Sequence, residues 1–366
     1  MNIECIKDKI KKALVLTDKI TAKNSTLPVL SCVLFCAKDN KLKIKATNLD
    51  IGVEIDVPAK ISKEGVCAIP GDVVRGFVSN ISEGGGISFS FEDDVVKVST
   101  SQNKTTIKTL SSDDFPSIPV VSGEQMFSVD SSMFVKGLKS VWYSASFSSM
   151  KPELSSVYVY PDDGHLVFVA TDSFRLAEKK IKTKATKNFD SVLIPFKNIP
   201  EIIKVLEIEK GEVEVHLSEN QIAFLTNGVY LTSRIVSGNF PDYKQILPKA
   251  FTTEVIVLKE DFSNALRASS VFSDKFNQAN ISVDSKEKVF SFSTKNKDVG
   301  ENTNILPATV KGDPIDIRFN YKYLSDCLSS IDSDSISFSF NGSNKPLIIQ
   351  GVSDRSFTYM VMPMNK

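Results

Sequence analysis

An internal repeat is the feature that most constrains the fold of this chain, because several different markers return in the same order about 125 residues apart. Helix-like stretches return after 124 and 128 residues, marked by Leu14, Leu138 and Leu266. A strand that runs into a second helix returns at intervals of 125 residues, marked by Pro70, Pro195 and Asn320. Proline suits such a junction, because it lacks an N–H and its fixed φ fits the first helical turn. The sequence therefore predicts three domains of similar fold.

The second helix of each repeat is followed by strands in which apolar and polar residues alternate. The letters ISFSF occur at 87–91 and again at 336–340, and VEVHL takes the corresponding place at 213–217. A polar turn and another alternating run follow each of them, which predicts a β-hairpin. We predict an α+β chain of antiparallel sheets with two helices per domain. The three predicted domains span 1–121, 122–248 and 249–366.

Composition limits where the chain works and what it binds. With 44 basic and 44 acidic residues the net charge is zero, so overall charge alone does not hold nucleic acid. No run of about 18 apolar residues occurs, and the opening letters MNIECIKDKI lack the apolar core of a signal peptide. We therefore expect a cytoplasmic protein without a membrane partner. The cysteines at 5, 32, 36, 67 and 327 form no Cys-x-x-Cys pair and are expected to be reduced core thiols.

The residue patterns of catalytic sites are missing from the sequence. The two histidines, His165 in an expected turn and His216 in an expected strand, have no cysteine or histidine at metal-ligand spacing. No Gly-x-Ser-x-Gly nucleophile motif and no Walker-type phosphate loop occurs. We therefore expect no cofactor, no metal and no catalysis, and a binding or scaffold protein in preference to a hydrolase.

Similar domains with sheet edges have a consequence for assembly. Sheet edges need to be covered or paired, and alike domains in a row can pair edge to edge along a curve. Where a second chain continues the curve, head-to-tail contacts can close a ring. Basic residues on the equivalent helices would then face a common centre and make weak, sequence-independent contacts with phosphates.

Three motifs connect the chain to a known family. The segments ATDSFRLA (170–177), FPDYKQILP (240–248) and VMPM (361–364) resemble those of the bacterial DNA polymerase III beta subunit, the replicative sliding clamp family. The segments TLPVLSCVLF (26–35) and TNLD (47–50) are also similar to that family, in the same order. The resemblance covers the whole chain.

The resemblance implies a homodimer that performs no chemistry. Six domains of two head-to-tail chains would form a ring around duplex DNA, with helices inside and sheets outside. The ring would tether the replicative polymerase and other DNA-processing proteins and so confer processivity. A clamp loader ATPase would open the ring, and partners would bind through short linear peptides in a pocket between the second and third domains.

The resemblance also implies which residues serve each role, since they match family motifs at these positions. The expected pocket residues are Leu154, Thr171, Ser173, Phe174, Arg175, Leu176, Pro241, Gln245, Ile246, Asn320, Tyr323, Pro346, Val361, Met362, Pro363 and Met364. The expected DNA-facing residues are Lys23, Asn24, Arg75, Lys151 and Lys197. The expected dimer-interface residues are Ile107, Val271 and Phe272.

The chain departs from the family pattern at the expected pocket. Phe174 takes a place where histidine is common, and Gln245 takes one where a basic residue is frequent. The tail is Asn365–Lys366 in place of a basic residue followed by leucine. These changes predict a different preference among partner peptides.

A second hypothesis has no role for DNA. The neutral charge, and the absence of interleaved aromatic and basic residues, also fit a repetitive β-rich interaction or ligand-binding module. Sedimentation distinguishes the two hypotheses, because a monomer that does not bind DNA would support the interaction or ligand-binding module.

Overall fold

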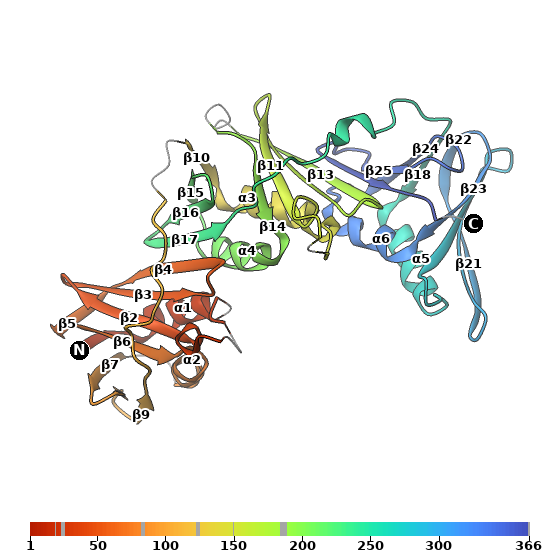
Figure 1. Ribbon diagram of the computed structural model, residues 1–366. Coiled ribbons are helices and arrows are strands. Elements are labelled where there is room, and N and C mark those ends of the chain that lie inside the picture. The colour runs from red at the N-terminus through yellow and green to blue at the C-terminus, as the bar shows by residue number, and fades with distance from the viewer. Residues whose placement is uncertain are drawn as a thin grey trace. The chain divides into compact units, whose positions relative to one another are not determined.

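The structure is a computed structural model that describes residues 1–18, 20–22, 26–81, 85–121, 125–148, 150–183 and 189–364. The chain divides into two compact units, and Figure 1 labels many of their strands and helices. Unit 1 contains Met1–Val135 and Lys197–Ile235, and unit 2 contains Lys136–Phe196 and Val236–Lys366. Within the described ranges, no helix has the length and apolar character needed to cross a membrane.

The same order of elements occurs three times along the chain: a strand, a helix, several strands, a second helix and three final strands. The first repeat consists of β1 (Asn2–Ile6), α1 (Lys7–Thr17), β2 (Cys32–Lys38), β3 (Lys41–Thr47), β4 (Ile51–Val57), β5 (Ala59–Lys63), β6 (Gly65–Pro70), α2 (Gly71–Asn80), β7 (Gly86–Glu92), β8 (Val95–Ser99) and β9 (Lys104–Lys108). The second consists of β10 (Gln125–Asp130), α3 (Ser131–Val141), β11 (Ser156–Asp162), β12 (His165–Thr171), β13 (Arg175–Lys182), β14 (Val192–Pro195), α4 (Ile199–Ile208), β15 (Glu212–Leu217), β16 (Gln221–Thr226) and β17 (Val229–Arg234). The third consists of β18 (Thr253–Leu258), α5 (Lys259–Ser270), β19 (Gln278–Asp284), β20 (Val289–Asn296), β21 (Gly300–Leu306), β22 (Ala308–Gly312), β23 (Ile315–Asn320), α6 (Tyr321–Asp326), β24 (Ser335–Phe340), β25 (Leu347–Gly351) and β26 (Phe357–Val361).

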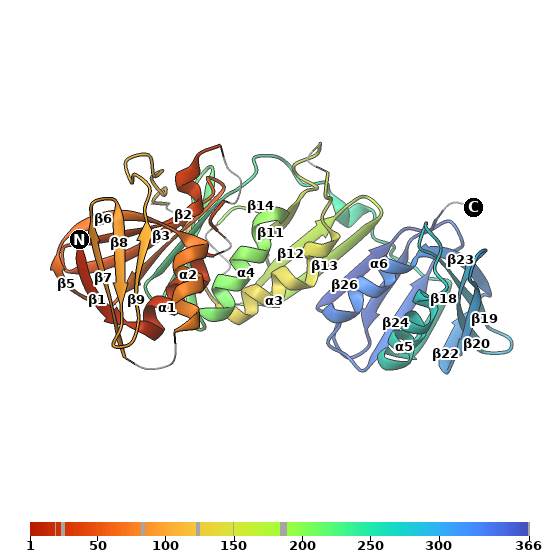
Figure 2. The same cartoon turned by 90° about the horizontal axis from the view of Figure 1, so that it is seen from below.

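Two residue periods build these elements. Side chains of β1 alternate between exposed and buried, as expected for a strand with one face on a core. Helix α1 buries Ile10, Ala13 and Leu14, whose spacing of three and four residues forms one apolar face. Figure 2 shows α1 beside α2 in unit 1 and α5 beside α6 in unit 2.

The two ISFSF segments occupy equivalent strands, as the sequence predicts. Strand β7 pairs with β1, β15 pairs with β10, and β24 pairs with β18, so each lies beside the first strand of its own repeat. Phe89 and Phe338 are fully buried in these strands. The equivalence of the three segments is confirmed.

Among the described residues, the strands form four antiparallel sheets, two in each unit. Unit 1 has a sheet of order β5-β1-β7-β8-β9 and an eight-stranded sheet of order β10-β15-β16-β17-β4-β3-β2-β6. Unit 2 has a nine-stranded sheet of order β14-β11-β12-β13-β26-β25-β24-β18-β22 and a sheet of order β21-β20-β19-β23. The predicted α+β class with two helices per repeat is confirmed.

Successive repeats are joined by sheet pairing. At the first junction β17 of the second repeat pairs with β4 of the first, and at the second junction β26 of the third repeat pairs with β13 of the second. The elements of the second repeat are therefore shared between the two units: β10 and β15 to β17 belong to unit 1, and β11 to β14 to unit 2.

The cysteines belong to the interior. Cys5, Cys32, Cys67 and Cys327 are buried, Cys36 is half-buried, and all five are free thiols. Burial raises the pKa of Cys5 and of Cys67 to about 12, which keeps these thiols protonated and unreactive at neutral pH.

Candidate functional site

The segment ATDSFRLA forms a tight turn between β12 and β13. Ser173 has a positive φ of 78°, and the hydroxyl of Thr171 donates to the carbonyl of Arg175 at 2.7 Å. The carboxylate of Asp172 accepts the backbone N–H groups of Phe174 and Arg175 at 2.9 and 3.0 Å. Local hydrogen bonds thus satisfy the turn and direct Phe174 outward, where its side chain is 62% exposed.

Arg175 is buried below this turn and joins the second repeat to the third. Its Nε pairs with Asp172 at 3.0 Å and its Nη1 pairs with Asp326 at 2.5 Å. Its Nη2 donates to the carbonyl of Tyr143, and the guanidinium lies 4.3 Å from the centre of the Tyr323 ring. These contacts use one N–H of each of its three nitrogens, so Arg175 is held beneath the turn and positions the site.

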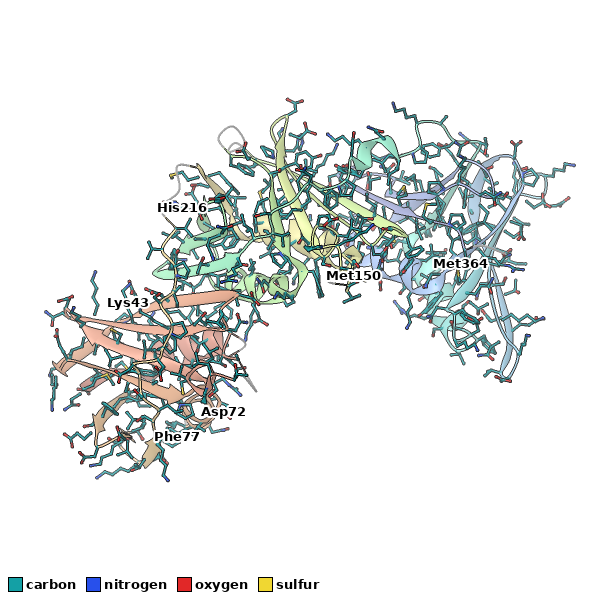
Figure 3. The ribbon with its side chains drawn as sticks, in the orientation of Figure 1. Lys43, Asp72, Phe77, Met150, His216 and Met364 are labelled. Atoms are coloured by element: carbon teal, nitrogen blue, oxygen red, sulfur yellow. The ribbon has the colours of Figure 1, made fainter. Side chains whose placement is uncertain are left out.

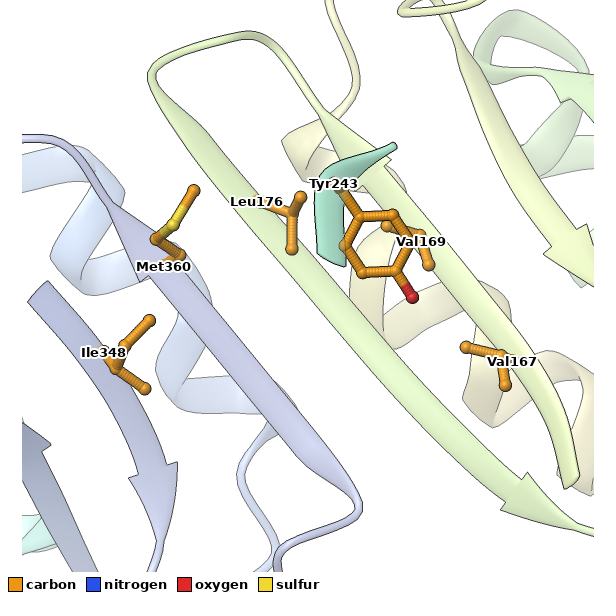
Figure 4. Close-up of a cluster of buried hydrophobic side chains, with 6 residues drawn as sticks. All are labelled: Val167, Val169, Leu176, Tyr243, Ile348 and Met360. Atoms are coloured by element: carbon orange, nitrogen blue, oxygen red, sulfur yellow. The ribbon is translucent and has the colours of Figure 1, made fainter. Parts of the chain in front are cut away.

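An apolar cluster lies on strands of both repeats beside the turn (Figure 4). Val169 and Leu176 from the second repeat, and Met360 and Ile348 from the third, are all buried in it. Met360 is paired with Leu176 across β26 and β13, which explains why the cluster crosses the junction.

The segment FPDYKQILP covers part of this cluster. Tyr243 is buried in the cluster, its hydroxyl donates to Glu178, and a 2.7 Å hydrogen bond joins it to the hydroxyl of Tyr160. Burial, together with the Glu178 carboxylate, raises the pKa of Tyr243, so the phenol stays neutral and can donate. The same segment exposes Pro241, Gln245 and Ile246, and the Gln245 amide donates to Asp242 at 2.7 Å.

The chain end VMPM lies against the turn and against β23. Val361 is buried and paired with Arg175, while the N–H of Met362 donates to the carbonyl of Phe174 at 2.8 Å. The N–H of Met364, labelled in Figure 3, donates to the carbonyl of Arg318 at 2.8 Å. Met362 is 37% exposed. Phe174, Ile246 and Met362 are called the apolar rim below.

The remaining expected pocket residues have mainly structural contacts. Asn320 caps α6 by accepting the N–H of Lys322 at 2.9 Å, and Leu154 is buried two residues before β11. Pro346 and Pro363 are half-buried; Pro346 directly precedes Leu347, and Pro363 lies two residues after Val361, the pairing partner of Leu347.

Phe276 is an exposed aromatic residue that the sequence reasoning missed. It is 60% exposed and lies two residues before Gln278, which pairs with Asn320. Its exposure depends on the turn after α5, where Asp274 accepts the N–H groups of Phe276 and Gln278. An aspartate two residues before an apolar residue is a weak signal, because it is common in ordinary turns.

Two of the three expected DNA-facing residues that the structure describes are paired with carboxylates. Arg75 forms an ion pair with Asp18 and Lys197 one with Asp50, each at 2.6 Å. Lys151 is exposed, whereas Lys23 and Asn24 lie outside the described residues.

The expected interface residues fall at two sheet edges. Ile107, in the edge strand β9, is only 6% exposed, so its side chain belongs to the core of its own repeat. Val271 is 65% exposed, and the ring of Phe272 lies against Gly300 at the start of the edge strand β21. Among the described residues, no group of three His, Cys, Asp or Glu side chains is placed to hold a metal.

Family models of the DNA polymerase III beta subunit match nearly the whole chain. The N-terminal domain model matches residues 1–119, the central domain model 128–242 and the C-terminal domain model 244–365.

Individual relatives agree with the family models. The beta sliding clamp of Synechococcus elongatus is 25% identical over all of this chain and 99% of its own length. The beta sliding clamp of Staphylococcus epidermidis is 26% identical over 95% of both chains. The solved DNA polymerase III beta subunit of Thermotoga maritima has 27% identity and a TM-score of 0.93, covering 100% of this chain and 99% of that one.

Proposed function

The chain belongs to the DNA polymerase III beta subunit family, and we propose that partners of this DNA sliding clamp dock as short peptides between its second and third domains. Sliding clamps of this family are non-catalytic processivity factors. They form homodimeric rings on DNA and bind polymerases through clamp-binding peptides. We also propose that a clamp loader ATPase opens the ring and that the protein is located in the cytoplasm.

The observation that carries the docking site is an exposed apolar rim beside a buried apolar cluster. Phe174 and Met362 are linked by a backbone hydrogen bond, and Ile246 lies in the segment FPDYKQILP, directly after the short helix Tyr243–Gln245. Burying one apolar anchor of a peptide contributes about 1.5–3 kcal/mol, so two anchors contribute about 3–6 kcal/mol, which corresponds to a Kd from several millimolar down to about tens of micromolar. The flexible thioether side chain of Met362 can adapt to different anchors.

A pair of methionine substitutions tests the docking site. Met362→Ser should lower stimulation of DNA polymerase III on a primed circular template about tenfold, because the substitution removes one apolar contact. Met126→Ser is the matched control, since Met126 is 47% exposed on β10 in unit 1. Equal stimulation by the two variants would contradict the proposed site.

We propose that the ring closes by the pairing rule of the two internal junctions. In both junctions the last strand of one repeat pairs with the third strand after the first helix of the preceding repeat, β17 with β4 and β26 with β13. The last strand of the first repeat is β9, and the third-repeat counterpart of β4 and β13 is β21. Both are edge strands in the structure, so β9 of one chain can pair with β21 of its partner.

A charge at this edge tests ring closure. Val271→Glu, beside Phe272, should shift the protein from twice 40.3 kDa toward the monomer, because a carboxylate would be desolvated in the interface. Ile256→Glu is the control, since Ile256 is also exposed but lies on the interior strand β18. A dimer of Val271→Glu that stays on circular DNA as well as the parent protein would contradict this interface.

We propose that DNA contacts inside the ring are weak. Arg75, Lys151 and Lys197, with Lys23 and Asn24, are the proposed contacts. The ion pairs of Arg75 and Lys197 with aspartates moderate the attraction for phosphate, which favours sliding over tight binding. Retention should therefore depend on DNA circularity more than on salt.

A further inference from the structure

A polar groove lies on the third repeat, next to the proposed docking site. It occupies about 1050 Å³ on the face of the β21-β20-β19-β23 sheet that carries Gln278, Asn280 and Ser293. The alternate residues of the same strands, such as Phe292, are buried and contact Phe262 of α5. Because side chains alternate along a strand, the groove lies on the face turned away from α5.

The groove continues directly from the proposed docking site. Arg318 lines it, and the carbonyl of Arg318 accepts the N–H of Met364 from the chain end. Gln278 also lines it and is paired with Asn320. Phe276, which also lines the groove, has an exposed aromatic side chain. A peptide anchored at the apolar rim therefore meets this groove with its flanking residues.

The groove carries as many cations as carboxylates, but more of its carboxylates than of its cations have a hydrogen-bonding or ionic partner. Three of its four carboxylates are satisfied: Asp274 by two backbone N–H groups, Asp316 by Asn280 and Glu301 by Lys295 at 2.9 Å. Asp298 is the fourth. Among the described residues, the cations of the groove that form no ion pair are Lys275, Lys297 and Arg318.

Two of these cations lie at the end nearest the docking site. Lys275 is placed over the ring of Phe276, with Nζ 5.1 Å from the ring centre. Arg318 lies on β23, two residues before Asn320. Both can rotate toward a carboxylate of a bound peptide without leaving another carboxylate unpaired.

We propose, building on the proposed docking of partner peptides, that this groove binds an acidic flank of those peptides through Lys275 and Arg318. The anchor supplies most of the affinity and the flank supplies selectivity. The acidic flank distinguishes partners of this clamp from peptides that carry an apolar anchor alone.

Synthetic peptides test the flank separately from the anchor. Fluorescein-labelled peptides with a Leu-Leu-Phe anchor carry three Glu or three Gln residues, on the amino side in one pair and on the carboxyl side in another. Binding to the full-length protein is followed by anisotropy. We expect one Glu peptide to bind about fivefold more tightly than its Gln counterpart at low salt, as two partly exposed ion pairs would give, and the preference to shrink at high salt.

Variants assign the preference to the groove. The double variant Lys275→Gln with Arg318→Gln should bring the Glu and Gln peptides to within about twofold of each other while leaving the Gln peptide's affinity unchanged. Lys286→Gln, in the exposed turn between β19 and β20 and outside the groove lining, should keep the preference.

The possible results distinguish a failure of the acidic-flank proposal from a failure of the docking-site proposal. Binding that Met362→Ser weakens, but that is indifferent to the flank, overturns the acidic flank alone. A preference for Glu that survives the double variant also overturns it. No binding of any anchor peptide overturns the docking site and the flank together.

Discussion

The two junctions between repeats share one backbone design. Residues Thr47–Ile51 at the first junction and Thr171–Arg175 at the second form the same turn, with φ of 77° at Leu49 and 78° at Ser173. In each turn the threonine hydroxyl donates to a carbonyl four residues ahead, and an Asn or Asp side chain accepts two backbone N–H groups. The same turn is therefore specified by the local sequence at both junctions.

The side chains that follow this backbone differ in kind. Asp50 accepts the N–H of Arg234 through its carbonyl at 2.8 Å, just as Phe174 accepts that of Met362. Asp50 is also paired with Lys197, so the first junction presents charges where the second presents an apolar rim. The difference teaches that docking chemistry depends on a few side chains placed on a repeated scaffold.

The largest effect is expected from breaking the buried cation of the second junction. Arg175→Ala leaves Asp172 and Asp326 without their partner and should lower the free energy of unfolding by about 3 kcal/mol. Arg234→Ala, at an exposed arginine of the first junction, should change it by less than about 0.5 kcal/mol. Urea denaturation measures both. A loss below about 1 kcal/mol for Arg175→Ala would show that its ion pairs are not what joins the two repeats.

A smaller effect is expected from the ion pairs that connect helices to the next repeat. Lys12 pairs with Glu209 at 2.7 Å in unit 1, and Lys136 pairs with Asp332 at 2.6 Å in unit 2. Glu209 is 5% exposed and Asp332 is 49% exposed. Lys12→Ala should therefore cost about 1–2 kcal/mol, and Lys136→Ala less than about 1 kcal/mol, in the same denaturation experiment. The reverse order would contradict the role assigned to burial.

The shared turn predicts matched effects at both junctions. Leu49→Gly and Ser173→Gly each remove a side chain from a left-handed conformation, which should stabilise the fold by up to about 1 kcal/mol. The larger conformational entropy of glycine in the unfolded chain offsets part of this gain. Equal shifts in the midpoint of thermal unfolding would support the equivalence. A strong destabilisation at Ser173 alone would show that its side chain has a role beyond the turn.

The smallest expected effect is on the loss of folding stability at acidic pH. The hydrogen bond from Lys136, aided by the charges of Lys136 and Lys179 and opposed by partial burial, lowers the pKa of Asp332. Because the folded pKa lies below the unfolded value, this contribution is fully present above the unfolded pKa of about 3.9 and is lost as pH falls through the folded one. Lys136→Met should reduce the slope with which the free energy of unfolding falls with pH between about pH 5 and the folded pKa of Asp332. An unchanged slope of unfolding free energy against pH would contradict it.

The sequence by itself determined the local and periodic features of this protein. Alternating residues and recurrent leucines predicted the strands, the helices and the equivalence of the ISFSF segments, because residue periods act within a single element. The turn at Thr171–Arg175 depends on local sequence, since its hydrogen bonds join residues at most four positions apart. The three motifs that carry the resemblance also predicted the family.

Only the tertiary structure decided how the repeats share their sheets and which side chains are free. Arg175 is 151 residues from Asp326 in sequence, so its engagement follows from the pairing of β13 with β26 and not from any local pattern. Ile107 stays a predicted interface residue; packing within its own repeat buries its side chain, and the backbone edge of β9 is also available for pairing. Phe276 and the groove beyond it emerge only when β19 and β23 lie side by side. The physical reason is the same in each case: periodicity shows which face of an element is apolar, whereas long-range strand pairing decides what that face meets.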